Sequence, residues 1–240
     1  MRVNANRALR MLVEKHPELK GQHVEIKVLQ PALQQGRYDP LTSGDEVLIQ
    51  ADMEGATGQV YTFHPRTFSG TVDAMANLPD VSPYYYPMVV AVLNAVVRKV
   101  GEIEKSVECS GDGPLQCAQH ICRSIKERHG ICRIGIIGFQ PCLLEEAAAV
   151  FGVENLAVTD LNPNNIGSFQ YGVEVWDGDK DNPPLIDFAD VLLIAGTALV
   201  NGKADKIFQQ AGDKPYYLFG TTAAGLASVN NMPWMCPMST

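Results

Sequence analysis

The sequence DVLLIAGTALVNG, residues 190–202, indicates the fold of this chain. Its four consecutive apolar residues, 191–194, are typical of a short strand that is buried on both faces of a parallel sheet. Small residues follow, with Gly196 and Thr197 in a loop that leads toward a helical segment. Ligands of open parallel sheets bind beyond the carboxyl ends of the strands. We therefore expect a binding site at this loop.

Helical and strand patterns alternate around this segment through the second half of the chain. Such alternation implies βαβ units, and hence a parallel sheet with right-handed crossovers. The chain is therefore predicted to be an α/β protein whose C-terminal part is a Rossmann-like domain. The predicted helices are 114–129, 143–151 and 204–211, and the predicted strands are 132–137, 156–159, 173–176, 191–194 and 216–219.

The first hundred residues have the pattern of a smaller α+β domain, with strands that alternate apolar and polar residues. A charged, glycine-containing run, 102–113, predicts the boundary between a domain of residues 1–105 and the Rossmann-like domain of residues 106–240. The elements expected in the first domain are a helix over 1–16, a strand over 24–28, a hairpin of 46–52 and 59–63, a short helix over 67–78 and a buried helix over 88–100.

The composition of the 240 residues is that of a globular protein, with 46% hydrophobic and 19% charged residues. A formal net charge of -8 and the lack of a dense Lys/Arg run argue against a nucleic-acid partner. The sequence has neither an apolar run of the ~18 residues that a membrane span needs nor a signal peptide at its start. We therefore expect a cytoplasmic protein with no membrane partner, whose six cysteines are reduced thiols.

The predicted strand ends provide candidate ligand-binding residues. The first loop, with Gly138, Phe139 and Gln140, stands where a dinucleotide fold has GxGxxG, and that fingerprint is absent. Asp160 follows the next strand at about the spacing of a ribose-binding acid, with Asn162 close behind it. Asx-Pro sequences also favour turns, so both interpretations of this loop stay open.

The third and fourth loops share a Gly-Thr sequence after a buried strand. Small residues let a ligand approach the backbone, and hydroxyl groups can hydrogen-bond it. Two such loops at one edge of a sheet favour a binding site over simple turns. The candidates are Gly196, Thr197 and Asn201 in the third loop and Gly220, Thr221 and Thr222 in the fourth.

Three further features of the sequence have two interpretations each. Arg66 is either a solvated loop residue or a clamp for an anion, since its guanidinium fits carboxylates and phosphates. Asn94, in the buried predicted helix, either bonds a neighbouring loop or contacts a ligand. Cysteines and histidines gather over 109–142 without a CxxC pair, which favours buried, inert thiols over a metal cluster. Cys236 stands apart, at the end of an expected last strand.

Three runs resemble the Rossmann-like domain of the putative heavy-metal chelation family, DUF364: DFADVLLIAGTALVNG (187–202), FGTTAAG (219–225) and GFQP (138–141). In that family a smaller domain, DUF4213, comes first and resembles the N-terminal domain of enolases, and residues 1–101 are compatible with it. The family tends toward GPTxP at the fourth loop, where this chain has GTTAA. The resemblance implies a site in the cleft between the domains, with Gly138, Phe139, Asp160, Thr197, Asn201 and Thr221 facing the first domain.

Two functional hypotheses follow from the loops and the resemblance. The first is a cytoplasmic protein that binds a heavy-metal ion or a small anionic metal chelate in the interdomain cleft. Its metal would be a transition-metal ion, with Cys142, Asp160 and Cys236 as the ligands to test. The alternative is an enzyme, a lyase or a transferase, that holds a nucleotide or an adenosyl cofactor, although no catalytic residues are identifiable by spacing. Exposed apolar helices are compatible with a homodimer.

Overall fold

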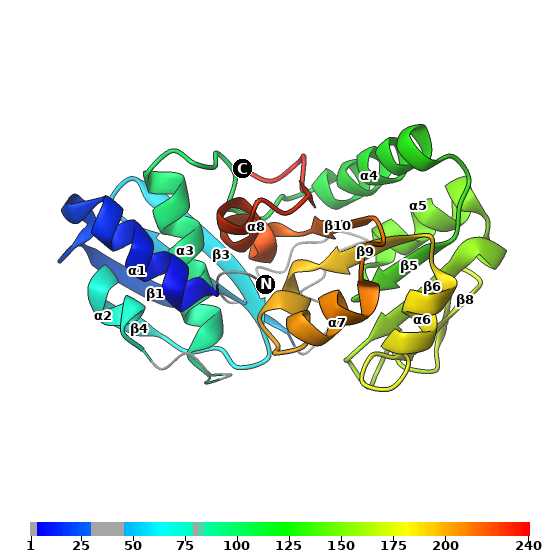
Figure 1. Cartoon of the computed structure of the whole chain (residues 1–240), viewed down its shortest axis with the longest axis horizontal. Helices are drawn as coiled ribbons and strands as arrows, with labels where there is room; N and C mark the ends of the chain where they lie inside the picture. Colours follow the sequence, from blue (N-terminus) through cyan, green and yellow to red (C-terminus); the bar gives the residue numbers. More distant parts are fainter. Residues whose placement is uncertain (1–3, 30–45, 79–81, 83) are drawn as a thin grey trace.

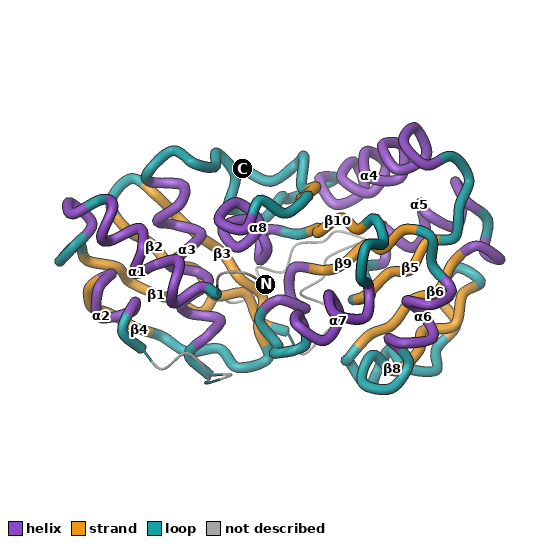
Figure 2. The backbone as a smooth tube through the Cα atoms, viewed as in Figure 1, coloured by secondary structure: helices purple, strands orange, loops and turns teal. Residues whose placement is uncertain are grey.

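The computed structural model of the chain describes residues 4–29, 46–78, 82 and 84–240. Two sheets organise these residues (Figure 1): a four-stranded sheet with α1, α2 and α3 at the left, and a seven-stranded sheet at the right. We call them the small sheet and the large sheet. Figure 2 shows helices on both sides of the large sheet, as the alternating pattern predicts.

The small sheet is antiparallel, in the order β3-β2-β1-β4. Its β2 and β3 form the predicted hairpin, in which Met53 pairs with Ala56 across a tight turn. Gly55 takes a φ of 76° in this turn, a conformation that glycine adopts without strain. The elements are α1 (Ala5–Lys15), β1 (His23–Leu29), β2 (Val47–Met53), β3 (Ala56–Thr62), β4 (Phe68–Thr71), α2 (Val72–Ala76) and α3 (Tyr86–Lys99), with a short 3-10 helix at Pro17–Leu19.

One prediction for this part of the chain is wrong. The segment 67–78 does not form a single helix, because Phe68–Thr71 pairs with β1 as an edge strand. The helix α2 begins at Val72, where Thr71 Oγ1 accepts a hydrogen bond from Ala74 N at 3.3 Å. Pairing with an existing strand overrides the helical spacing of the apolar residues here.

The large sheet confirms the Rossmann-like prediction, with the order β11-β10-β9-β5-β6-β8-β7. Its strands pair in parallel except where the short β7 joins β8. Numbered along the chain without β7, the strands have the order 3-2-1-4-5-6 of dinucleotide-binding folds. That order reverses between β5 and β9, where such folds bind their ligands.

The helices of this part cover the two faces of the large sheet. The helices α4 and α5 pack on one face, and α6, α7 and α8 pack on the other, in a core that continues into the small sheet. The elements are α4 (Gly113–His129), β5 (Ile134–Ile137), α5 (Pro141–Phe151), β6 (Leu156–Asp160), β7 (Phe169–Gln170), β8 (Val173–Asp177), α6 (Asn182–Phe188), β9 (Val191–Ala195), α7 (Ala204–Ala211), β10 (Tyr216–Phe219), α8 (Ala224–Asn230) and β11 (Trp234–Met235), with 3-10 helices at Val153–Asn155, Gly196–Leu199 and Thr221–Ala223.

The helix α3 connects the two sheets, because it packs against β3 on one side and α8 on the other. Gly58 of β3 lets the helix come close, since a Cβ at this position would lie 2.3 Å from Ala91 O and 2.4 Å from Ala95 N. The predicted burial of the helix is confirmed: Val89, Leu93 and most of their neighbours on α3 are fully buried.

Asn94 of α3 is a structural link rather than a ligand-binding residue. It is fully buried, and its Nδ2 donates to Gln59 O at 3.0 Å and to Thr221 O at 3.2 Å. Its Oδ1 accepts a hydrogen bond from Gly225 N at 2.7 Å. The amide therefore ties β3, the fourth loop and α8 together, and the prediction of a ligand contact for Asn94 is wrong.

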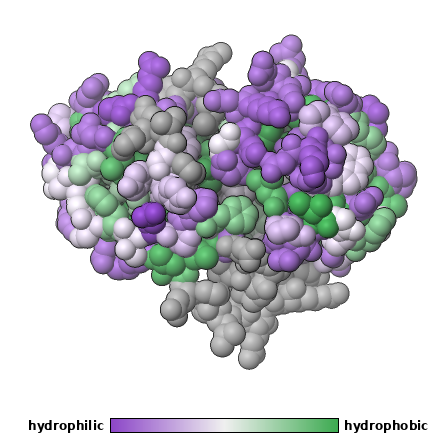
Figure 3. All heavy atoms as spheres, turned by 90° about the horizontal axis from the view of Figure 1, so that it is seen from below, coloured by the Kyte–Doolittle hydropathy of each residue, from purple (hydrophilic) through white to green (hydrophobic). Residues whose placement is uncertain are grey.

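Figure 3 shows one face of the molecule, on which hydrophilic side chains cover much of both halves and hydrophobic side chains form smaller patches. In the part of the chain that the structure describes, no helix is long and apolar enough to cross a bilayer.

Candidate functional site

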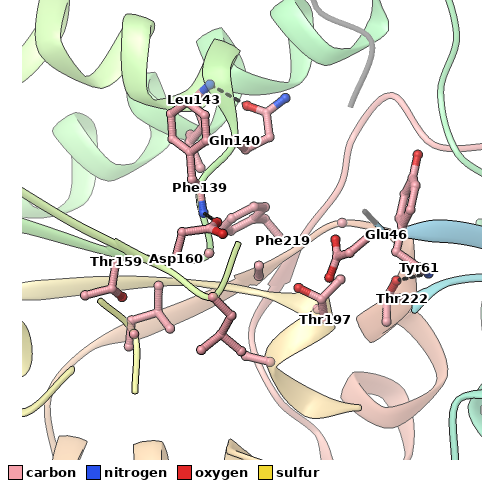
Figure 4. Close-up of a pocket in the computed structure, with 18 of the residues that line it drawn as sticks. Glu46, Tyr61, Phe139, Gln140, Leu143, Thr159, Asp160, Thr197, Phe219 and Thr222 are labelled. Carbon is pink, nitrogen blue, oxygen red and sulfur yellow. Dashed lines mark hydrogen bonds between the residues drawn. The ribbon is translucent and has the colours of Figure 1, made fainter. Parts of the chain in front are cut away.

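A cavity of about 190 Å³ lies at the carboxyl ends of β5, β6, β9 and β10. Its far wall comes from the other sheet: Tyr61 and Phe63 at the end of β3, and Glu46 just before β2 (Figure 4). The cavity thus lies where the order of the large sheet reverses, as the fold predicts. Of the predicted residues it is lined by Gly138, Phe139, Gln140, Asp160, Asn162, Gly196, Thr197, Asn201, Gly220, Thr222 and Cys236.

Three other predicted residues lie away from this cavity, besides Asn94. Thr221 is fully buried, and its hydroxyl donates to Glu108 Oε2. Arg66 lies over the ring of Tyr84, 5.0 Å from its centroid, beside a separate depression of the small-sheet side. Cys142, the second residue of α5, is fully buried in the core that α4 and α5 form with the large sheet. The predicted metal set of Cys142, Asp160 and Cys236 is therefore not brought together.

Asp160 fastens two loops at the floor of the cavity. Its Oδ2 accepts a hydrogen bond from Phe139 N at 2.7 Å, and its Oδ1 accepts one from Asn162 N at 2.6 Å. These bonds show that Asp160 shapes the turn, and its role in ligand binding stays a prediction. Burial raises the pKa of the Asp160 carboxyl, against the lowering effect of these hydrogen bonds. Asp160 also lines the cavity.

The first loop holds its own helix end. Gln140 Oε1 accepts a hydrogen bond from Leu143 N at 2.5 Å, so the side chain caps α5. Gly138 has a φ of 96°, and a Cβ there would lie 2.5 Å from the Cβ of Ala195 on β9. The loop is thus packed against the neighbouring strand. The backbone N–H of Leu143, which a pyrophosphate would use at this helix end, is already bonded to Gln140.

Glu46 is the most informative lining residue that sequence reasoning missed. Figure 4 shows its carboxyl directed into the cavity near Thr197, across from Asp160. Burial, and to a smaller extent the charge of Asp160, raise the pKa of Glu46 to about 7. In the sequence, Glu46 is an ordinary polar residue at the start of a strand. It reaches the site only because the small sheet packs beside the large one.

Glu108 adds a third carboxyl to the lining. Its Oε2 accepts a hydrogen bond from the Thr221 hydroxyl, and its backbone N donates to Gln59 Oε1 at 2.7 Å. Burial raises the pKa of its carboxyl. Glu108 lies in the charged run 102–113 that predicts the domain boundary, and nothing in that run indicates a site.

Acidic side chains outnumber basic ones in the cavity lining. Among the lining residues that the structure describes, Lys203 is the only lysine or arginine, and it pairs with Asp179. The same lining includes the apolar side chains of Phe139, Ile207 and Phe219. This arrangement favours a ligand with an apolar part and a positive or hydrogen-bond-donating centre.

The cavity also contains thiols, from Cys109, Cys117 and Cys236. Within the described ranges, however, no group of three or more His, Cys, Asp or Glu side chains is placed to hold a metal ion. A metal that enters this cavity would need most of its ligands from another source, unless two protein ligands suffice for it.

Comparisons with known proteins agree with the fold and with the sequence resemblance. Residues 123–231 match the family DUF364, described as "Putative heavy-metal chelation". Similar solved structures include a DUF364 protein of unknown function from Pyrococcus horikoshii, with a TM-score of 0.56, 15% identity, and coverage of 90% of this chain and 80% of that one. Another, from Desulfitobacterium hafniense DCB-2, has a TM-score of 0.56, 11% identity, and coverage of 93% and 82%. No curated protein matches the chain.

Proposed function

We propose that the chain binds a small metal chelate, neutral or positively charged, in the cleft between its two sheets. The observation that carries this proposal is the pair of carboxyls from Glu46 and Asp160, which come from the two sheets, line one cavity and repel each other. A positive centre between them would replace this repulsion by attraction. Both sheets are needed, because each contributes one of the two carboxyls.

A chelate suits the cavity better than a bare ion. The described residues offer no set of three metal-ligating side chains, so an ion alone would keep most of its coordination positions unfilled by protein. A chelator that fills those positions would leave one or two for Glu46 and Asp160. Its organic part would contact Phe139, Ile207 and Phe219 on the apolar wall. The match to the family described as putative heavy-metal chelation supports the metal.

The charge proposed here for the chelate is neutral or positive, whereas the sequence predicted an anionic chelate. An anion would enter a cavity lined by Glu46, Glu108 and Asp160, against a single lysine that already has a partner. Burial of unpaired like charges is costly. A neutral or cationic chelate avoids this cost.

The test uses the one-to-one complex of Ni²⁺ with histidine, a cation, as the probe in calorimetric titrations of the full chain. We expect binding to the wild type that weakens about tenfold or more in Glu46→Gln, because the variant loses a charge that faces the metal. Binding should strengthen from about pH 6 to about pH 8, since Glu46, with its pKa of about 7, ionises over this range.

The controls separate this site from non-specific charge effects. Glu127→Gln removes an exposed carboxyl on α4 and should bind the complex as the wild type does. The anionic complex of Ni²⁺ with nitrilotriacetate should bind more weakly than the histidine complex. Equal affinities of the wild type and Glu46→Gln, or a preference for the anionic complex, would contradict the proposal.

A further inference from the structure

One end of the cavity carries hydrogen-bond donors that the proposed metal contacts do not use. Asn162 follows β6, and Asn182 begins α6 just after β8. Both residues line the cavity and are nearly buried, with exposed fractions of 4% and 8%. In Figure 1, β6 and β8 lie on the side of the large sheet away from the small sheet. We call this part of the lining the β6–β8 end.

The oxygen of each of these side-chain amides is already engaged within the protein. Asn182 Oδ1 accepts a hydrogen bond from Thr159 Oγ1 at 2.7 Å, and Asn162 Oδ1 accepts one from Asn164 N at 2.9 Å. Within the described ranges, neither Nδ2 atom donates to a protein group. Because nearly buried polar groups need partners, the two NH₂ groups favour a ligand that accepts hydrogen bonds.

Lys203 adds a positive charge to the same end. It lines the cavity, and its Nζ pairs with Asp179, three residues before Asn182 in the loop between β8 and α6. Gly178 N of this loop donates to Asp160 O at 2.8 Å, which holds the loop against the end of β6. One ammonium group and two amide groups are therefore available where β6 and β8 end.

The ion pair of Lys203 can be exchanged for an ion pair with a ligand. The side chains of Lys203 and Asp179 are 40% and 57% exposed, and pairs between exposed side chains contribute little to stability. A ligand carboxylate that reaches Lys203 from inside the cavity would be less screened by water than Asp179 is. The released Asp179 faces solvent, so the exchange leaves no buried charge without a partner.

We propose that the β6–β8 end binds the carboxylate of the chelator, and that the chelator is an amino carboxylate such as an amino acid. The inference rests on the proposed function, because it places the metal between Glu46 and Asp160. Ammonium and amide groups donate to carboxylates, and the bond from Lys203 is charge-assisted. Nitrogen ligands suit transition metals, and the amino group supplies one.

This class of ligand agrees with the charges of the cavity. A divalent metal ion with one amino acid anion keeps a net positive charge, as the proposed function requires. Its metal would face the acidic side chains, and its carboxylate would face Lys203. Both charges of the ligand would thus have partners of opposite sign.

The experiment compares the one-to-one Ni²⁺ complexes of histidine and of histamine, which has the same imidazole and amine but no carboxylate. Both are titrated calorimetrically into the full chain. In Lys203→Met the affinity for the histidine complex should fall about fivefold or more, because a charge-assisted hydrogen bond is lost. The affinity for the histamine complex should stay the same or rise, since a positive charge near this cation is removed.

Lys180→Met is the matched control. Lys180 also pairs with an aspartate close to the same loop, Asp177, but its side chain is 79% exposed and it is absent from the cavity lining. This variant should keep the wild-type ratio of the two affinities, histidine complex over histamine complex. The ratio should fall about fivefold or more in Lys203→Met alone.

Crystals of the wild type soaked with the histidine complex provide a second measurement that needs no variant. They should show the ligand carboxylate within hydrogen-bond distance of Lys203 Nζ. A carboxylate directed away from Lys203, or an affinity ratio that Lys203→Met leaves unchanged, would overturn the inference.

The failure of this inference differs from the failure of the proposed function. If both complexes bind more weakly to Glu46→Gln while Lys203→Met keeps the affinity ratio, only the carboxylate subsite is rejected. If the wild type binds neither complex, both proposals are rejected.

Discussion

At the scale of single residues, the site depends on a carboxyl that the sequence could not reveal. Asp160 was predictable, because it follows a buried strand at a sheet edge where ligands bind. Glu46 was not, because nothing local distinguishes it from other polar residues before a strand. Its role comes from the burial and the neighbouring charge that raise its pKa to about 7.

That pKa makes a prediction about stability. An unfolded Glu46 ionises near its ordinary value of 4.5, whereas the folded residue ionises at about 7. Between these values the unfolded state binds fewer protons, so the free energy of unfolding falls as the pH rises through this window and levels off above it. Glu46→Gln removes the ionisable group, so the stability of this variant does not fall in that window. The difference in unfolding free energy, variant minus wild type, should be about 1–2 kcal/mol larger at about pH 8 than at about pH 5.

Urea unfolding of both proteins at the two pH values measures this difference, with Glu127→Gln at the exposed surface of α4 as the matched control. A gain for Glu46→Gln that is equal at both pH values would show that Glu46 is not buried as described.

At the scale of elements, most helices and strands followed from periodicity, and the exceptions have physical causes. The helix α3 was predictable because it is apolar nearly all round. The strand β4 was not, because only its pairing with β1 distinguishes it from the start of a helix. The helix α6 was not among the predicted helices; two prolines follow its first residue, Asn182, at positions where a helix tolerates them. For Asn94 the structural interpretation was one of the two considered. Its side-chain amide makes hydrogen bonds to three backbone groups.

The contact between α3 and β3 provides the second prediction. Gly58→Ala should destabilise the protein by about 3 kcal/mol, because its Cβ would meet backbone atoms of Ala91 and Ala95 that cannot move alone. Gly70→Ala on β4 is the control, since its Cβ would meet the ring of Phe68, which can turn aside. Its cost should stay below about 1 kcal/mol. Similar urea midpoints for the two variants would mean that α3 does not pack as closely as the structure has it.

At the scale of the whole molecule, periodicity predicted the parallel sheet and the family resemblance implied a cleft between two domains, but neither predicted how the small sheet meets the large one. Alternating helices and strands imply βαβ units, and small-residue loops after buried strands mark the functional edge. Which face of the small sheet meets that edge depends on α3 and on contacts such as Tyr61 N with Thr222 Oγ1 at 3.0 Å. Such long-range contacts leave no local pattern. The division at residue 105 and the likeness of the first part to enolase N-terminal domains stay predictions.

The central claim is that a metal-bearing ligand lies between Glu46 and Asp160, in the cavity that both sheets line. Anomalous X-ray diffraction at the nickel absorption edge, from crystals of the full chain soaked with the one-to-one Ni²⁺–histidine complex, tests it most directly. The account predicts a nickel peak inside the cavity, next to the carboxyls of Glu46 and Asp160, and a clearly weaker peak in crystals of Glu46→Gln soaked in the same way. A nickel peak only at other positions, or one of equal height in the cavity of Glu46→Gln, would contradict it.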